Sequence, residues 1–130
     1  PGTKFHVMSG TKLEFNDGQF DQVLTIATLH HIEDTGVIDT IREARRVCGN
    51  GGQVHIIEAV YPQNPFKVLN TLVFALDRGQ HQRTFDGLME LLAKTFPINI
   101  AVTKSGIPHD VCYISIPAAI ASATNEGTGA

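Results

Sequence analysis

A buried strand, an amphipathic helix and a second buried strand follow one another early in the chain, and this order constrains the fold most. The run Val23–Leu29 is apolar without alternating polar positions, which is typical of a strand covered on both faces. Apolar residues recur at helical spacing over 37–48, and Gly49–Gly52 then favours a helix end. Val54–Ile57 is a second apolar strand. Two parallel strands joined by a helix predict an α/β fold with a right-handed crossover.

Local patterns predict the remaining elements in the same way. Asp34 or Thr35 can cap the first helix, because a short polar side chain satisfies free backbone N–H groups there. The other expected elements are a brief strand at Phe5–Met8, a mostly apolar helix over Pro65–Leu76, a helix capped by Thr84 that stops at Pro97, and strands at Ile98–Thr103 and Val111–Ile116. We expect one domain over residues 1–117 and a small polar tail over 118–130.

Composition narrows the class of ligand. With 42% hydrophobic and 18% charged residues, the chain can bury a core of its own. A formal net charge of -3 and the lack of a long basic run argue against a nucleic-acid or membrane-surface partner. No apolar stretch reaches the roughly 20 residues that span a bilayer, and no export signal opens the chain, so we expect a cytoplasmic protein with a small ligand. Cys48 and Cys112 are expected to be buried free thiols.

Several short motifs occur in the order found in one enzyme family. The letters LEF at 13–15, FDQV at 20–23 and LHHIED at 29–34 are followed by EARRVCGNGG at 43–52 and LDRG at 76–79. This series resembles the C-terminal portion of class I S-adenosylmethionine (SAM)-dependent methyltransferases. The resemblance implies a partial Rossmann-like sheet, mostly parallel with an antiparallel last strand, and helices on both faces. It also implies methyl transfer from SAM to a small-molecule acceptor.

The glycine-rich turn that opens this family's cofactor site has no counterpart in the sequence. Only four residues precede Phe5, and the glycines at 49–52 leave a helix instead of opening one. Losing two hydrogen bonds to charged groups, at about 1.5–3 kcal/mol each, would weaken binding roughly 100- to 10,000-fold. We therefore expect the chain alone to bind SAM weakly or not at all and to transfer methyl groups poorly.

The resemblance assigns the remaining part of a cofactor site by position. Ser9 and Gly10 fall where the family has an acidic and a small residue beside the adenine, so Ser9 is a departure and a weaker acceptor. Ala27 and Thr28 fall at the end of the strand that approaches the sulfonium and the substrate. These four residues are the expected cofactor contacts.

His30 and His31 leave three interpretations open. Adjacent residues at a strand end point to opposite sides, and no third ligand has suitable spacing, so a metal site is not expected. His30 is either a packed or capping histidine or a side chain that faces the substrate. If the acceptor is a hydroxyl, amine or thiol that needs a base, His30 is the catalytic candidate.

The acceptor pocket is expected to use residues after the second strand. Glu58, Tyr61, Arg78 and Arg83 are the candidates for substrate binding. The alternative is that they form a solvated loop with a surface ion pair.

A non-catalytic function is the alternative for the whole chain. In the resembled family the strand at Val23–Leu29 pairs with a strand that is absent here, so its edge would be open. An open apolar edge invites pairing with another chain. We expect either that Phe5–Met8 fills the gap or that a second copy or a partner covers the edge, which would make the chain an oligomeric or interaction module.

Overall fold

The computed structural model describes residues 2–62, 72, 76, 80–106 and 110–119. The elements are β1 (Phe20–Ile26), the 3-10 turn η1 (Leu29–His31), α1 (Asp34–Val47), β2 (Cys48–Val60), α3 (Phe85–Ala93), β3 (Ile100–Lys104) and β4 (Asp110–Pro117). The helix predicted at Pro65–Leu76 and the tail from residue 120 lie mostly or wholly outside the described residues. Within the described part, no helix has both the length and the apolar composition that a membrane crossing requires.

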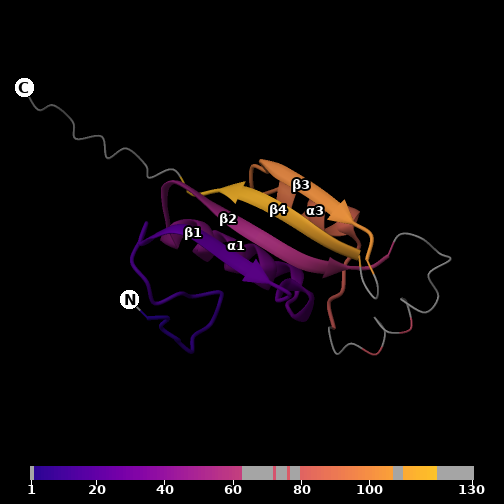
Figure 1. Cartoon of the computed structure of the whole chain (residues 1–130), viewed down its shortest axis with the longest axis horizontal. Helices are drawn as coiled ribbons and strands as arrows, with labels where there is room; N and C mark the ends of the chain where they lie inside the picture. Colours follow the sequence, from indigo (N-terminus) through magenta and orange to yellow (C-terminus); the bar gives the residue numbers. More distant parts are fainter. Residues whose placement is uncertain (1, 63–71, 73–75, 77–79, 107–109, 120–130) are drawn as a thin grey trace, which may run out of the picture.

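The four strands form one mixed sheet in the order β1-β2-β4-β3 (Figure 1). β1 and β2 are parallel, with Ile26 opposite Ile57, and β4 is antiparallel to both of its neighbours. β1, β2 and β3 therefore run in one direction and the last strand runs against them. This arrangement confirms the expected α/β sheet.

The strand–helix–strand unit forms as the sequence predicts, with corrections at its boundaries. β1 begins at Phe20 and ends at Ile26, so Leu29 lies beyond the strand in η1. The expected cap at Asp34 or Thr35 is wrong, since Glu33 is the N-cap of α1 and no side chain caps the helix. Buried residues at helical spacing pack α1 against the sheet, because they put one apolar stripe on its inner side: Val37, Ile41, Ala44 and Val47.

The glycines after α1 do not form the separate turn that we expected. β2 already begins at Cys48, so Gly49–Gly52 lies inside the strand. A Cβ added to Gly52 would lie 2.3 Å from the Asp21 carbonyl oxygen and 2.7 Å from Cys48 Sγ. The glycine is required here because β1 approaches too closely for any side chain.

The strands of the C-terminal half and the start of its helix confirm their predictions, but α3 ends at Ala93, before the predicted stop at Pro97. The hydroxyl of Thr84 accepts a hydrogen bond from the Gly87 backbone N–H and caps α3. Leu88, Leu92 and Phe96 are buried against the sheet, as their spacing predicts.

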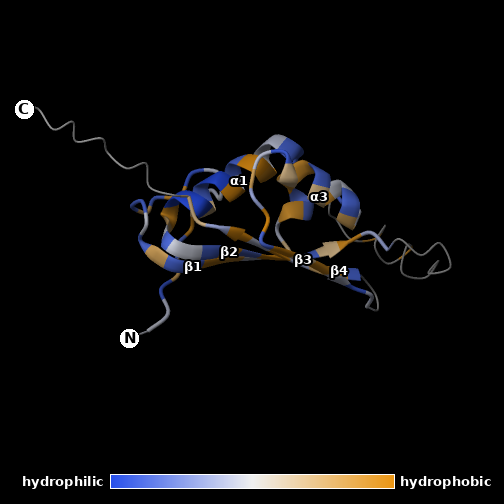
Figure 2. Cartoon of the chain, turned by 90° about the horizontal axis from the view of Figure 1, so that it is seen from above, coloured by the Kyte–Doolittle hydropathy of each residue, from blue (hydrophilic) through white to orange (hydrophobic). Residues whose placement is uncertain are grey.

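The core lies between the sheet and the two described helices, α1 and α3, which cover the same face (Figure 2). The other face carries an apolar row across all four strands, because Ile26 pairs with Ile57, Ile57 with Tyr113, and Tyr113 with Val102. Ile26 is 56% exposed and Val102 is 53% exposed. The resemblance predicts helices on both faces of the sheet. In the described part of the chain, helices cover one face only.

The N-terminal segment does not complete the sheet. The strand predicted at Phe5–Met8 is wrong, since these residues belong to no strand and Phe5 is 91% exposed. β1 is therefore an edge strand of the described sheet. It is also not covered on both faces, since Leu24 is 55% and Ile26 is 56% exposed. The segment is instead attached to α1 through Arg46, whose guanidinium donates to the carbonyl oxygens of Leu13 and Phe15 and to the carboxylates of Asp17 and Glu43.

Both cysteines are free and buried, as expected. Burial, followed by the negative charge of Glu58, raises the pKa of the Cys112 thiol to about 11, above its ordinary value of 9.0. A thiol whose pKa is higher in the folded than in the unfolded protein contributes its full stability at pH values below the unfolded-state pKa. This contribution is lost as the pH rises through the folded-state pKa.

We expect the difference in unfolding free energy between the wild type and Cys112→Ala to shrink from pH 9 to pH 11. Urea titrations of both proteins across this range measure it, and a constant difference would contradict the prediction.

Candidate active site

Two neighbouring strand ends bring the site together. β1 and β2 are parallel, so their carboxyl ends lie at the same edge of the sheet, where ligands of open α/β sheets bind. Glu58 follows Ile57 directly in β2, and His30 lies in the turn η1 just after β1. The topology therefore places a carboxylate and an imidazole side by side, although 28 positions separate them in the sequence.

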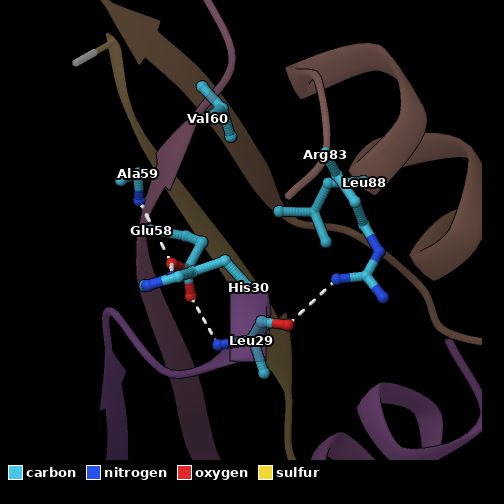
Figure 3. A pocket seen from close by; sticks show the side chains of 7 residues that line it. All are labelled: Leu29, His30, Glu58, Ala59, Val60, Arg83 and Leu88. Atoms are coloured by element: carbon cyan, nitrogen blue, oxygen red, sulfur yellow. Dashed lines mark hydrogen bonds and ion pairs between the residues drawn. The ribbon is translucent and has the colours of Figure 1, made fainter. Parts of the chain in front are cut away.

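Glu58 is the centre of the hydrogen-bond network. One carboxylate oxygen, Oε2, accepts from the backbone N–H groups of Thr28 (3.0 Å) and Leu29 (2.7 Å). The other, Oε1, lies 2.5 Å from His30 Nδ1 and accepts from the Ala59 N–H at 3.2 Å. Figure 3 shows the carboxylate beside Leu29, His30 and Ala59. Only 3% of Glu58 is exposed, and a buried carboxylate requires such a set of donors.

This pairing determines the chemistry open to His30. With Glu58 as a carboxylate, which only accepts hydrogen bonds, His30 Nδ1 is the donor of this bond. In the neutral imidazole the lone pair is then on Nε2, the atom that can take up a proton. A histidine oriented by a carboxylate in this way is the usual arrangement of a general base.

A backbone irregularity at Ala27 shapes the turn that carries His30. Ala27 has a φ of +49°, in the left-handed region that non-glycine residues rarely adopt. The residue turns the chain from β1 into η1 while its N–H still donates to Ile57 at 2.9 Å. Thr28 and Leu29 can then direct their N–H groups to Glu58.

Replacing Ala27 with glycine should relieve this strain. We expect a gain of up to about 1 kcal/mol in the free energy of unfolding, since the left-handed conformation costs alanine roughly 1–2 kcal/mol and the freer unfolded chain offsets part of the gain. Thermal and urea unfolding measure the change. A clear loss of stability would show that the methyl group of Ala27 makes contacts that outweigh the strain.

A small cavity adjoins the two acid–base side chains. Its volume is about 10 Å³, room for about one water molecule, and its lining is Leu29, His30, Glu58, Ala59, Val60, Arg83 and Leu88 (Figure 3). The described residues thus enclose the base closely instead of leaving a wide pocket beside it.

Arg83 lies at this cavity but is turned toward the protein. Nε and Nη2 donate to Asp34 Oδ1, Nη1 donates to the carbonyl oxygens of Leu29 and His81, and Nη2 also donates to that of Ile32. A guanidinium has five N–H donors, and these five hydrogen bonds occupy all of them. Arg83 lies in the loop before α3 and forms an ion pair with the exposed Asp34, as the alternative expects, but its own side chain is only 13% exposed and its donors point to protein acceptors.

The remaining expected site residues are Tyr61, Arg78, Ser9 and Gly10. Tyr61 lies beside Thr84 in an isolated bridge, and its N–H donates to the Arg83 carbonyl oxygen at 2.9 Å. Arg78 lies outside the described residues. Ser9 bonds to Thr11, and a Cβ on Gly10 would contact Thr40 of α1, so this pair lies beside the helix.

The partnership of His30 with Glu58 was not predicted from the sequence. Glu58 was expected in the acceptor pocket, and His30 was considered without a partner. The signal was present, since Glu58 lies near the carboxyl end of β2 and His30 lies in the turn after the adjacent parallel strand β1. Among the described residues, no three histidine, cysteine or acidic side chains gather as a metal site would need.

Solved structures share this architecture over most of the chain. A SAM-dependent methyltransferase from Methanosarcina mazei matches 90% of this chain with a TM-score of 0.68 and 20% sequence identity. A protein from Pyrococcus horikoshii matches 89% with a TM-score of 0.65 and 17% identity. Human N-acetylserotonin methyltransferase, solved in complex with SAM, matches 88% with a TM-score of 0.62 and 18% identity. The chain spans 68%, 59% and 34% of these three proteins, respectively.

The chain therefore has the fold of a SAM-dependent methyltransferase, with the His30–Glu58 pair at the carboxyl edge of its sheet. Residues 1–56 also match the sequence model of a family described as a methyltransferase domain. None of the curated proteins matches the sequence significantly. The fold and the family match agree with the resemblance found in the motifs.

Proposed function

We propose that this chain forms part of a SAM-dependent methyltransferase in which His30 acts as general base toward a small acceptor. The observation that carries the proposal is the buried bond between His30 Nδ1 and Glu58 Oε1, 2.5 Å long, at the carboxyl edge of a methyltransferase-like sheet. This bond holds the imidazole in the form that can take a proton from a hydroxyl, amine or thiol. Base catalysis of this kind contributes typically 100- to 10,000-fold to a rate.

SAM, when bound, would supply the methyl group. The described residues could contact one part of SAM. Thr28 is exposed just after β1, where the resemblance puts the sulfonium group. Ala27 and Thr28 would hold that end, and Ser9 and Gly10 would approach the adenine. The chain's own contribution is to orient the base His30. We propose that residues after β2, including Tyr61 and Arg78, contact the acceptor.

Titration of the purified chain with S-adenosylhomocysteine and SAM, together with methyl-transfer assays on phenol, amine and thiol acceptors, tests this function. Binding of either ligand, with transfer that requires His30, would support it. A folded chain that binds the ligand and transfers a methyl group equally well after His30→Ala would contradict it. A folded chain that binds neither at millimolar concentration would favour the non-catalytic alternative.

The open sheet face supports that alternative as an interaction module. The apolar surface is defined as Leu24, Ile26, Ile57, Ile100, Val102 and Tyr113, and Leu24, Ile26, Ile100 and Val102 are each at least 50% exposed. Its polar neighbour His55 already bonds to Tyr113 Oη at 2.8 Å and to Gln22 Oε1 at 2.5 Å.

We propose that a second copy covers β1 and this apolar surface. Light scattering on the purified chain should give a dimer, and Ile26→Lys should shift it to a monomer because an ammonium would be buried without a partner. Glu90→Lys, on the exposed side of α3, is the control and should stay dimeric. A wild-type monomer at micromolar concentration, or one that joins only a different protein, would contradict the self-association.

A further inference from the structure

Arg83 connects the two elements that carry the proposed acid–base pair. Its side chain donates to the carbonyl oxygens of Leu29 and Ile32, which bracket His30 in and after η1. Its backbone carbonyl accepts from Tyr61, three residues after Glu58 at the end of β2. One residue thus links both strand ends across the site.

The segment around Arg83 holds the turn η1 at three carbonyl groups. In addition to the two bonds from the guanidinium, the His81 N–H donates to the His30 carbonyl oxygen at 3.0 Å. The guanidinium also contacts Asp34, the first residue of α1, at 2.9 Å from Nε and 2.6 Å from Nη2. A three-residue 3-10 turn has few hydrogen bonds of its own, so its position depends on such outside donors.

We propose that Arg83 is a positioning residue that holds the His30 turn against Glu58. The inference rests on the proposed function, in which His30 is the base. It replaces the expectation that Arg83 binds the acceptor, because an arginine with all five donors engaged and a side chain only 13% exposed would have to break protein bonds to bind a ligand. Its effect on catalysis is exerted through His30.

The first test reads the tautomer of His30 directly and needs no methyl transfer. Nitrogen-15 NMR of histidine-labelled protein distinguishes a protonated Nδ1 from a protonated Nε2, and His30→Asn identifies the His30 signals among the six histidines. In the wild type we expect Nδ1 to carry the proton. In Arg83→Met we expect the two nitrogen shifts to move toward the averaged values of an unconstrained imidazole.

Arg46→Met is a matched control. Arg46 also makes five side-chain hydrogen bonds, to Leu13, Phe15, Asp17 and Glu43, at the other end of α1. Its loss should leave the His30 shifts unchanged. If Arg83→Met does not fold, Asp34→Asn weakens two of the five bonds while keeping the arginine, and a smaller shift in the same direction is expected.

Kinetics separate positioning from acceptor binding. A misplaced base should lower kcat ten- to a hundredfold in Arg83→Met with KM within about twofold, whereas loss of an acceptor contact would raise KM instead. Arg83→Lys should recover part of kcat, since an ammonium can make some of the lost bonds.

Unchanged His30 shifts in folded Arg83→Met, or equal changes in Arg46→Met, would overturn the positioning role. A wild-type His30 without a protonated Nδ1 would instead contradict the proposed function itself, so the two failures are distinguishable.

Discussion

Replacing Glu58 with alanine is expected to lower the free energy of unfolding by about 3–5 kcal/mol, the usual cost of removing one partner of a buried, hydrogen-bonded pair. The side chain accepts from the N–H groups of Thr28, Leu29 and Ala59 and from the His30 ring, and all four donors would lose their acceptor. Urea unfolding followed by circular dichroism measures the loss.

Two variants separate the causes of this loss. Glu58→Gln keeps the size of the side chain and one oxygen, so we expect a smaller loss, because only the contacts made through the other oxygen are replaced by an amide. Glu90→Ala removes a carboxylate that is exposed and pairs with Lys94, and it should have no measurable effect. A loss below about 1 kcal/mol in Glu58→Ala would mean that the network does not hold the strand ends together.

Replacing His30 with alanine is expected to lower the rate of methyl transfer by about 100- to 10,000-fold if the acceptor must lose a proton. Affinity for S-adenosylhomocysteine should stay within about threefold, because the expected cofactor contacts are Ala27, Thr28, Ser9 and Gly10. A radiolabel-transfer assay and a calorimetric titration on the same preparation give the two numbers.

His31→Ala is the control for this prediction, since His31 is adjacent but exposed, with its ring centroid 4.0 Å from that of His30. It should retain the wild-type rate within about threefold. An acceptor that is already a thiolate at the assay pH should lose little rate in His30→Ala, because no proton has to be removed. Equal losses in both histidine variants, or with both kinds of acceptor, would contradict the role of His30 as a base.

The sheet face opposite α1 and α3 raises a separate question about what the chain binds. Central strands of α/β sheets are usually covered on both faces, and here β2 has Ile57 in the row that crosses the uncovered face. The self-association experiment therefore tests an independent property of the chain, and its outcome leaves the acid–base proposal unaffected.

The sequence alone determined those elements that depend on residues close to one another in the chain. Apolar periodicity located α1, and Thr84 marked the start of α3 because its hydroxyl caps the helix by itself. The strands β3 and β4 followed from β-rich apolar runs near Gly106. The ordered motifs also indicated the methyltransferase fold, since motif order reflects the order of strands and helices in that fold.

The tertiary structure decided what depends on partners distant in the sequence. Phe5–Met8 has the composition of a strand but no neighbouring strand to bond with, and Gly49–Gly52 extends β2 because Asp21 of β1 lies against Gly52. The sequence offered Glu58 and Arg83 as candidate ligand contacts. The fold makes Glu58 the partner of His30 and engages Arg83 with the turn, because hydrogen bonds across 28 and 54 positions form only after the sheet has brought the strand ends together.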